Sequence, residues 1–225
     1  MMKGRTWNWN AAVNTICSVM AMIYYTTTAT KESPQYTVVH ADSDFEIRLY
    51  QTSVWISAPA VDIISFEKAT WNGFHRLFQF TQGANLNFSR ISMTSPVLTT
   101  MVPRSGPLDS QGYYVSLYLP EKFQSDPPVP LPELNIKPYE FDSHCVAVRK
   151  FSGIAKDERI VKEAEKLEKS LSRSQWGESK IEHGGYSIAQ YKYTPFRFAK
   201  RRNEVWVDIH APELGCDVGG VAAAY

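Results

Sequence analysis

The sequence has only three cysteines, no long hydrophobic run outside its N-terminal segment and no excess of charge of either sign. Three cysteines are too few for a disulfide framework, and Cys17, Cys145 and Cys216 lack the spacing of metal ligands. The net charge of +1 excludes the strongly basic profile of a dedicated nucleic-acid binder. The hydrophobic content of 44% excludes a disordered chain, so the 225 residues predict one or two small globular domains.

The sequence also lacks the short motifs that mark common catalytic and cofactor sites. It has no nucleophile elbow, no phosphate-binding glycine loop, no dinucleotide fingerprint and no paired His or Cys zinc motif. Its five histidines are scattered without metal-site spacing: His40, His75, His144, His183 and His210. Residues 200–202 form a short basic run, which is either a solvated turn or an anion-binding site. None of these patterns predicts an enzyme.

Residues 1–30 differ in composition from the rest of the chain. They include Lys3 and Arg5, no acidic residue, and an apolar run at 11–25 that small residues follow. This order is typical of a secretory signal peptide, because the run is too short and too polar for a membrane span. A transit peptide, an anchor and a disordered tail are the alternatives. We therefore expect a mature chain without a stable membrane span, in the secretory pathway or outside the cell, with organellar and cytoplasmic locations as alternatives.

Between residues 31 and 210 one order of elements occurs twice. Alternating apolar residues predict eight strands, four in each half: 45–49, 54–61, 97–102, 113–119, and then 135–141, 144–151, 186–193, 204–209. One-faced apolar spacing predicts helices at 62–81 and 157–172. Asp62 is the expected N-cap of the first helix, and Gly83 its stop.

A proline-rich connector at 126–132 separates the two halves, because prolines so closely spaced exclude a helix or a central strand. The pattern predicts one α+β domain built from two similar strand–strand–helix–strand–strand halves, whose sheets close on each other. Residues 211–225 are rich in Gly and Ala and are expected to form a loose C-terminal tail.

The first expected helix carries two apolar stripes. One narrow stripe is suited to packing on a sheet: Phe66, Ala69, Gly73, Leu77 and Phe80. Trp71, Phe74 and Phe78 form a second stripe more than a quarter turn away, with His75 and Gln79 beside it. Either the helix has an unusually broad core face, or the second stripe contacts a ligand.

Three motifs, in this order, resemble those of the SOUL haem-binding protein family: Phe45-Glu46-Ile47-Arg48-Leu49-Tyr50 with Trp55, then Ile91-Ser92-Met93-Thr94-Ser95-Pro96-Val97, then Arg201-Arg202-Asn203-Glu204-Val205-Trp206. The resemblance spans residues 36–209, and the chain looks most like the plant members that carry a leader peptide. It implies a distorted antiparallel β-barrel with two flanking helices. It also implies that haem or a related tetrapyrrole binds, without catalysis, in an apolar cleft beside the first helix.

The same resemblance assigns residues to the cleft by position. The cleft residues of the family's helix correspond to these: Trp71, Phe74, Phe78 and Gln79. The basic residue that reaches the porphyrin propionates, in the loop before the last strand, corresponds to Arg197. Because two helix positions that are basic in some members are Trp71 and Gln79 here, propionate pairing would either fall to Arg197, Lys200 or Arg76 or be lost.

The resemblance does not extend to an axial ligand. Leu49 stands where one branch of the family has its proposed axial histidine, and His75 is the only histidine near the second stripe. The sequence thus predicts a haem carrier or buffer without an obligatory axial histidine. The alternative is a SOUL-fold module that has lost tetrapyrrole binding and binds a protein partner, which the sequence does not identify.

Overall fold

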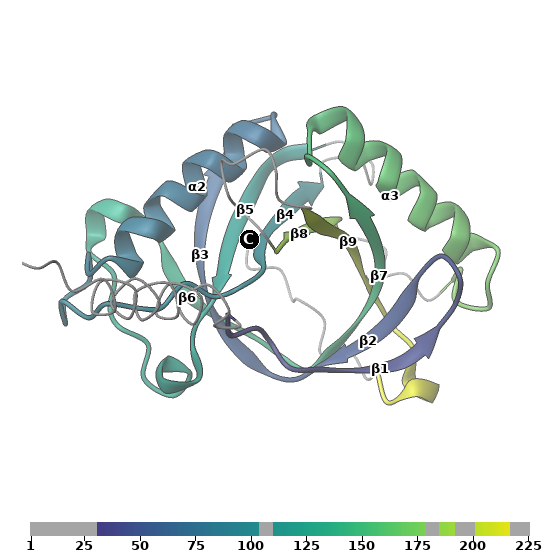
Figure 1. Cartoon of the computed structure of the whole chain (residues 1–225), viewed down its shortest axis with the longest axis horizontal. Helices are drawn as coiled ribbons and strands as arrows, with labels where there is room; N and C mark the ends of the chain where they lie inside the picture. The colour runs from purple at the N-terminus through teal and green to yellow at the C-terminus, as the bar shows by residue number, and fades with distance from the viewer. Residues whose placement is uncertain (1–30, 104–109, 179–184, 192–200, 217–225) are drawn as a thin grey trace, which may run out of the picture. The chain divides into compact units, whose positions relative to one another are not determined.

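The body of the chain is a strongly curled sheet of nine strands with two α-helices outside the curl (Figure 1). This computed structural model describes residues 31–103, 110–178, 185–191 and 201–216. The strands are β1 (Tyr36–Ala41), β2 (Glu46–Tyr50), β3 (Ser53–Val61), β4 (Val97–Pro103), β5 (Ser110–Tyr118), β6 (Lys137–Phe141), β7 (His144–Ser152), β8 (Ser187–Gln190) and β9 (Arg202–Ile209). The helices are α2 (Phe66–Thr81) and α3 (Asp157–Ser172). The predicted α+β class with a distorted antiparallel barrel is confirmed.

The two halves of the chain interleave in the sheet. Its order is β1-β2-β7-β9-β8-β4-β5-β3-β6, and every neighbouring pair is antiparallel. The pairs β2–β7, β4–β8 and β3–β6 join a strand of the first half to one of the second. Strand β1 was not predicted, so the first half has one strand more than the second.

Each helix covers part of the sheet's outer face, because the strands beneath it alternate between an apolar outer residue and a residue that points inside the curl. On β3, Ile56 and Ala58 belong to the cluster that packs under α2, whereas Trp55 lies in the aromatic cluster of the opposite face. In the same way, Ala147 of β7 and Val205 of β9 belong to the cluster that packs under α3. Among the described residues, neither helix is long and apolar enough to cross a membrane.

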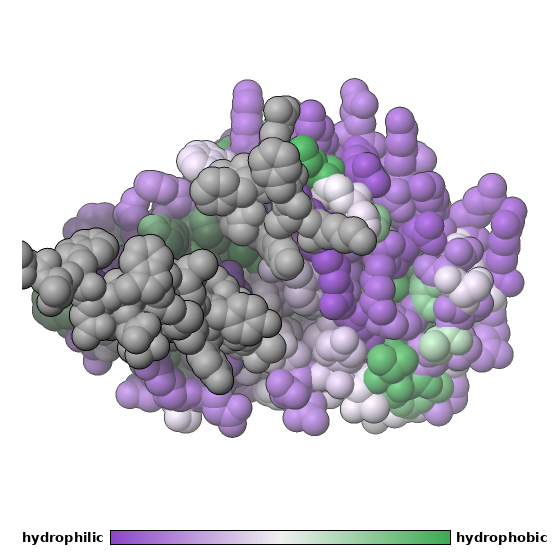
Figure 2. Space-filling model, viewed as in Figure 1, coloured by the Kyte–Doolittle hydropathy of each residue, from purple (hydrophilic) through white to green (hydrophobic). Residues whose placement is uncertain are grey.

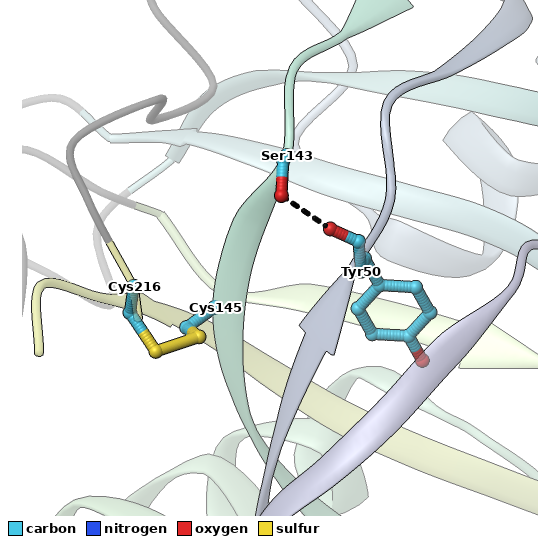
Figure 3. Close-up of a disulfide and its surroundings, with 4 residues drawn as sticks. All are labelled: Tyr50, Ser143, Cys145 and Cys216. Atoms are coloured by element: carbon cyan, nitrogen blue, oxygen red, sulfur yellow. Dashed lines mark hydrogen bonds between the residues drawn. A yellow bond between two sulfur atoms is a disulfide. The ribbon is translucent and has the colours of Figure 1, made fainter. Parts of the chain in front are cut away.

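The chain after β9 is folded back onto β7. Cys145 and Cys216 form a disulfide with 5.4 Å between their Cα atoms, beside the hydrogen bond from Ser143 to the backbone oxygen of Tyr50 (Figure 3). Ala211 forms a β-bridge with Cys216, and both residues are buried. Residues 211–216 therefore differ from the loose tail expected from the sequence, and 217–225 lie outside the described residues.

Candidate functional site

The N-cap of helix α2 lies three residues later than the sequence predicted. Its N-cap is Ser65, whose Oγ accepts a hydrogen bond from the Lys68 backbone N–H at 3.4 Å. The carboxylate of Asp157, at the start of α3, accepts hydrogen bonds from Ser65 Oγ at 2.8 Å and from the Phe66 backbone N–H at 2.6 Å. Asp62 instead adopts a left-handed backbone with φ of 64°, so its prediction as N-cap is wrong.

The first apolar stripe holds α2 against the sheet as predicted. Phe66, Leu77 and Phe80 are at most 1% exposed. Gly73 allows close approach, because a Cβ atom built there would lie 2.5 Å from Val115 on β5. Only a glycine fits that contact without a shift of β5, so the depth of the helix on the sheet is fixed.

The second stripe lies mostly outside this core. Trp71 is 63% exposed and Phe78 is 42% exposed, while Phe74 is half-buried against the cluster under α2. The Phe74 and Phe78 rings lie 6.2 Å apart, and the exposed His75 ring stacks on Trp71 at 6.5 Å. A broad core face is therefore excluded for Trp71 and Phe78. Large exposed aromatic side chains on one helix are typical of a surface that binds something else.

Hydrogen bonds on the two flanks of α2 show which way the second stripe faces. On one flank Thr70 Oγ1 bonds Thr99 Oγ1 of β4 at 2.9 Å, and Phe74 follows Thr70 on that side one helical turn later. On the other flank the Arg76 guanidinium donates to the backbone oxygens of Pro59, Leu134 and Asn135. The aromatic stripe thus lies on the β4 side of α2.

This arrangement removes one of the predicted propionate partners. Arg76 lies on the opposite flank from Phe74, and its Nη1 and Nη2 atoms donate to backbone oxygens. Burial also lowers the pKa of Arg76 from its ordinary value, because it disfavours the charged form. The prediction that Arg76 could pair with a ligand at the second stripe is therefore wrong.

The remaining predicted cations lie in the segment that follows β8. Strand β8 pairs with β4, so that Gln190 at its end is opposite Val97 at the start of β4. Arg197 and Lys200 belong to residues 192–200, outside the described residues. Gln79 is exposed on α2, next to Phe78 in the chain.

Leu49, the position of the family's proposed axial histidine, lies far from the second stripe in the sheet. It sits on β2 opposite Cys145 and packs against the cluster under α3. Strands β7, β9 and β8 separate β2 from β4 in the sheet order. Among the described residues no group of three or more His, Cys, Asp or Glu side chains could hold a metal ion.

Sequence reasoning missed a buried polar network that joins two of the three motifs. Arg48 and Glu204 are both fully buried and pair through two hydrogen bonds, of 2.8 and 3.1 Å. The Glu204 carboxylate also accepts from Arg202 Nε at 3.1 Å, from Trp206 Nε1 and from the Tyr191 hydroxyl, each of the latter at 2.9 Å. Arg202 is therefore part of this structural network, and anion binding by the basic run is not supported at that residue. The one signal in the sequence that pointed to this network was Arg48, a cation within a largely apolar strand motif.

The network also sets the ionisation of Glu204. Burial favours the neutral carboxyl, but hydrogen bonds and charge from Arg48, with further hydrogen bonds from Arg202 and Trp206, outweigh it. The net result is a pKa for Glu204 below its ordinary value of 4.5. At neutral pH the carboxylate is charged and compensates the buried guanidinium.

Comparison with known proteins identifies the family. The sequence profile described as "SOUL heme-binding protein" matches residues 31–208. Heme-binding protein 2 of Homo sapiens is 32% identical over 163 residues, covering 72% of this chain and 77% of the relative. Heme-binding protein 1 of Xenopus laevis is 32% identical over 162 residues, covering 72% of this chain and 82% of the relative.

One solved structure shows the fold beyond the family. The C-terminal domain of EcmrR superposes with a TM-score of 0.51 at 9% identity, covering 78% of this chain and 98% of that domain. An identity this low concerns the arrangement of the backbone only. The profile match, the two relatives and the curled sheet with its two helices agree, and the chain belongs to the SOUL haem-binding protein family.

Proposed function

We propose that this protein binds haem or a related tetrapyrrole, without catalysis, on the flank of α2 that carries Trp71, Phe74 and Phe78, and that it acts as a carrier or buffer. The observation that carries the proposal is the exposure of Trp71 and Phe78 beside the half-buried Phe74. A porphyrin is a large apolar disc with two carboxylates, so it requires an apolar surface with cations at the rim. Two relatives named for haem binding support this reading at the level of the family.

The cations of the proposed site are Arg197 and Lys200, in the segment that follows β8. The pairing of β8 with β4 supports this assignment, because the stripe lies on the β4 side of α2. Charge-assisted hydrogen bonds from these side chains would hold the propionates. Gln79 and His75 supply polar groups at the edge of the stripe.

The proposed site holds haem by apolar contact and rim charge, without an obligatory axial histidine. Leu49 cannot ligate iron, and three strands separate its strand β2 from β4 in the sheet. His75 already stacks on Trp71. Haem without a strong protein ligand exchanges readily between proteins, which suits a buffer.

A protein-binding module without a ligand is the second candidate, because of one further apolar surface. Leu86 and Phe88, in the loop after α2, are 59% and 83% exposed, and Val129 is 54% exposed. The Leu86 backbone N–H donates to the Val129 backbone oxygen at 2.9 Å, so these two residues are adjacent. The engagement of Arg76 by backbone oxygens also removes one cation from the tetrapyrrole site.

Titration of the purified body with haemin separates the two candidates. We expect a Soret band that saturates, with weaker binding in Trp71→Ala and Phe78→Ala. Since both side chains are exposed, neither change should cost more than about 0.5 kcal/mol of stability. Leu77→Ala is the control for stability, because the Leu77 side chain is fully buried in the first stripe. Its loss should lower the free energy of unfolding by ~2–5 kcal/mol. Absence of a saturable Soret band would favour the protein-binding module.

We also propose that the mature protein resides in an oxidising compartment of the secretory pathway or outside the cell. The disulfide between Cys145 and Cys216 supports this location, since such bonds persist mainly in oxidising compartments. The signal-like composition of residues 1–30 supports it independently. N-terminal sequencing of the protein from its native cells tests it, because a sequence that begins at Met1 would contradict cleavage.

A further inference from the structure

A second concave region lies between the two helices, apart from the aromatic stripe. A cavity of about 750 Å³ opens where the N-terminal ends of α2 and α3 meet over the outer face of β4, β5 and β8. From α2 it is lined by Phe66 and Lys68, while Trp71, Phe74 and Phe78 take no part. Its volume falls within the range of ~300–1,000 Å³ that is typical of small-molecule sites.

The wall of this cavity is mostly apolar. Five buried side chains come from both helices and from three strands: Phe66, Met101, Ala164, Ile188 and the ring of Tyr113. The rim is apolar as well, since Ile64 is 79% exposed and Val161 is 37% exposed. Figure 2 shows hydrophobic surface where α2 and α3 approach each other, with hydrophilic side chains over the rest of α3. An apolar rim around an apolar cavity indicates a ligand entrance.

Three hydroxyl groups in the wall already have partners within the protein. Thr99 Oγ1 bonds Thr70 at 2.9 Å, and the Tyr113 hydroxyl donates to the Ile64 backbone oxygen at 3.2 Å. Ser65 Oγ donates to Asp157 at 2.8 Å. A ligand that needs several hydrogen bonds would have to break these contacts, and each break leaves a buried polar group unsatisfied.

The charges at the cavity disfavour an anion. Asp62 and Asp157 line it together with a single cation, Lys68. The charges of these three side chains sum to −1, so the two propionates of haem would be repelled here. The positive N-terminus of α2 does not offset this repulsion, because the Asp157 carboxylate already binds there. Electrostatics thus separate this cavity from the proposed tetrapyrrole site.

We propose that this interhelical cavity is a second ligand site, which takes a small neutral molecule that is largely apolar, and that it is independent of the tetrapyrrole site. The ligand would contact Phe66, Met101 and Ile188 and would be held by burial of apolar surface. Because the cavity lies where α2 and α3 are joined by Ser65 and Asp157, its occupant would contact both helices.

The neutral fluorophore N-phenyl-1-naphthylamine tests this proposal, since its emission rises in apolar surroundings. We expect saturable binding to the full chain. Ala164→Phe fills the cavity from α3, and Val161→Glu places a further carboxylate at its rim. Each change should weaken binding of the fluorophore about tenfold or more. Val161→Glu also covers the case in which the larger side chain of Ala164→Phe prevents folding.

The matched control is Val38→Glu, which makes the same change at a similarly exposed valine outside the cavity lining and should leave binding unchanged. Trp71→Ala should also leave fluorophore binding unchanged. The proposal is overturned if the wild-type protein shows no saturable binding, or if Trp71→Ala abolishes binding while Val161→Glu does not. Neither result depends on whether haem binds.

Discussion

Arg48 and Glu204 are 156 residues apart in the sequence and form a buried ion pair, with 2.8 Å between Nη1 and Oε2. Arg48 belongs to the first family motif and Glu204 to the last, so two motifs by which the family is recognised meet inside the sheet. Neither side chain is exposed, and further hydrogen bonds from Trp206 and Tyr191 satisfy the carboxylate. These motif residues stabilise the fold. The proposed ligand site lies in a different place, on α2.

Loss of one partner of this pair should destabilise the protein strongly. Glu204→Gln keeps the shape of the side chain but removes the buried one of the two carboxylates that pair with Arg48, the other being that of Glu46. Loss of one partner of a buried pair costs up to ~3–5 kcal/mol. Urea denaturation measures the loss. Glu158→Gln, at an exposed position on α3, is the control and should stay within about 0.5 kcal/mol of wild type. A Glu204→Gln protein as stable as this control would show that the pair contributes nothing.

The same pair should give stability a specific pH dependence. The pKa of Glu204 is lower in the folded protein than its ordinary value of 4.5, because the hydrogen bonds and charge from Arg48 outweigh burial. The stability that this carboxylate contributes is therefore fully present above 4.5 and is lost as the pH falls through the lower, folded-state pKa. The stability gap between wild type and Glu204→Gln should narrow on acidification from pH 7. A gap that stays constant would contradict the assigned ionisation.

The disulfide between Cys145 and Cys216 should stabilise the body by cross-linking residues 71 positions apart. Replacing both cysteines with alanine should cost ~2–4 kcal/mol in denaturation experiments. A reductant should lower the stability of wild type but leave the double variant unchanged. Equal stability of wild type with and without reductant, with the bond shown by mass spectrometry to be reduced, would contradict a structural role.

Two arginines should behave oppositely if Arg197 pairs with the propionates. Arg197→Ala should weaken haemin binding roughly tenfold, because a good charge-assisted contact contributes ~1.5–3 kcal/mol. Arg76→Ala should leave haemin affinity unchanged and cost about 1.5 kcal/mol of stability, since its partly buried guanidinium donates to backbone oxygens. Titration and urea denaturation of both variants measure these effects. The reverse pattern would place the propionates on the other flank of α2.

His75 should not be an obligatory iron ligand. The ring stacks on Trp71 at 6.5 Å and is exposed, so His75→Ala should change haemin affinity much less than Arg197→Ala does. The Soret position should also be unchanged, because no axial bond is lost. If His75→Ala instead abolishes a low-spin spectrum, the iron is ligated from α2 and the proposed binding mode is wrong.

The elements were predictable where a local pattern decides them. Alternation gave the strands of both halves, and one-faced spacing gave α2 and α3. Strand β1 was missed because it lies at the edge of the sheet, pairs only with β2 and alternates little between exposed and buried residues. The start of α2 was misplaced because Asp157, distant in the sequence, accepts hydrogen bonds from Ser65 and Phe66.

The residues of the candidate site could be predicted from the sequence, but the side of α2 on which they lie could not. Periodicity alone separated Trp71, Phe74 and Phe78 from the core stripe. The side of α2 on which they lie depends on contacts of Thr70 with β4 and of Arg76 with residues of distant loops. The interhelical cavity was not predictable, because its wall combines residues of two helices and three strands that only the fold brings together.

The most direct test of the central claim is a map of where haemin binds, by two-dimensional ¹H–¹⁵N NMR of the labelled body. Paramagnetic iron broadens the amide signals nearest to it, so the position of the ligand is measured without any substitution. We predict that signals of Trp71, Phe74, Phe78 and Gln79 on α2 are lost first, together with those near the end of β8. Broadening centred on Leu49 and β2, or on Ile160 and Ala164 at the interhelical cavity, would contradict this account, as would a spectrum that haemin leaves unchanged.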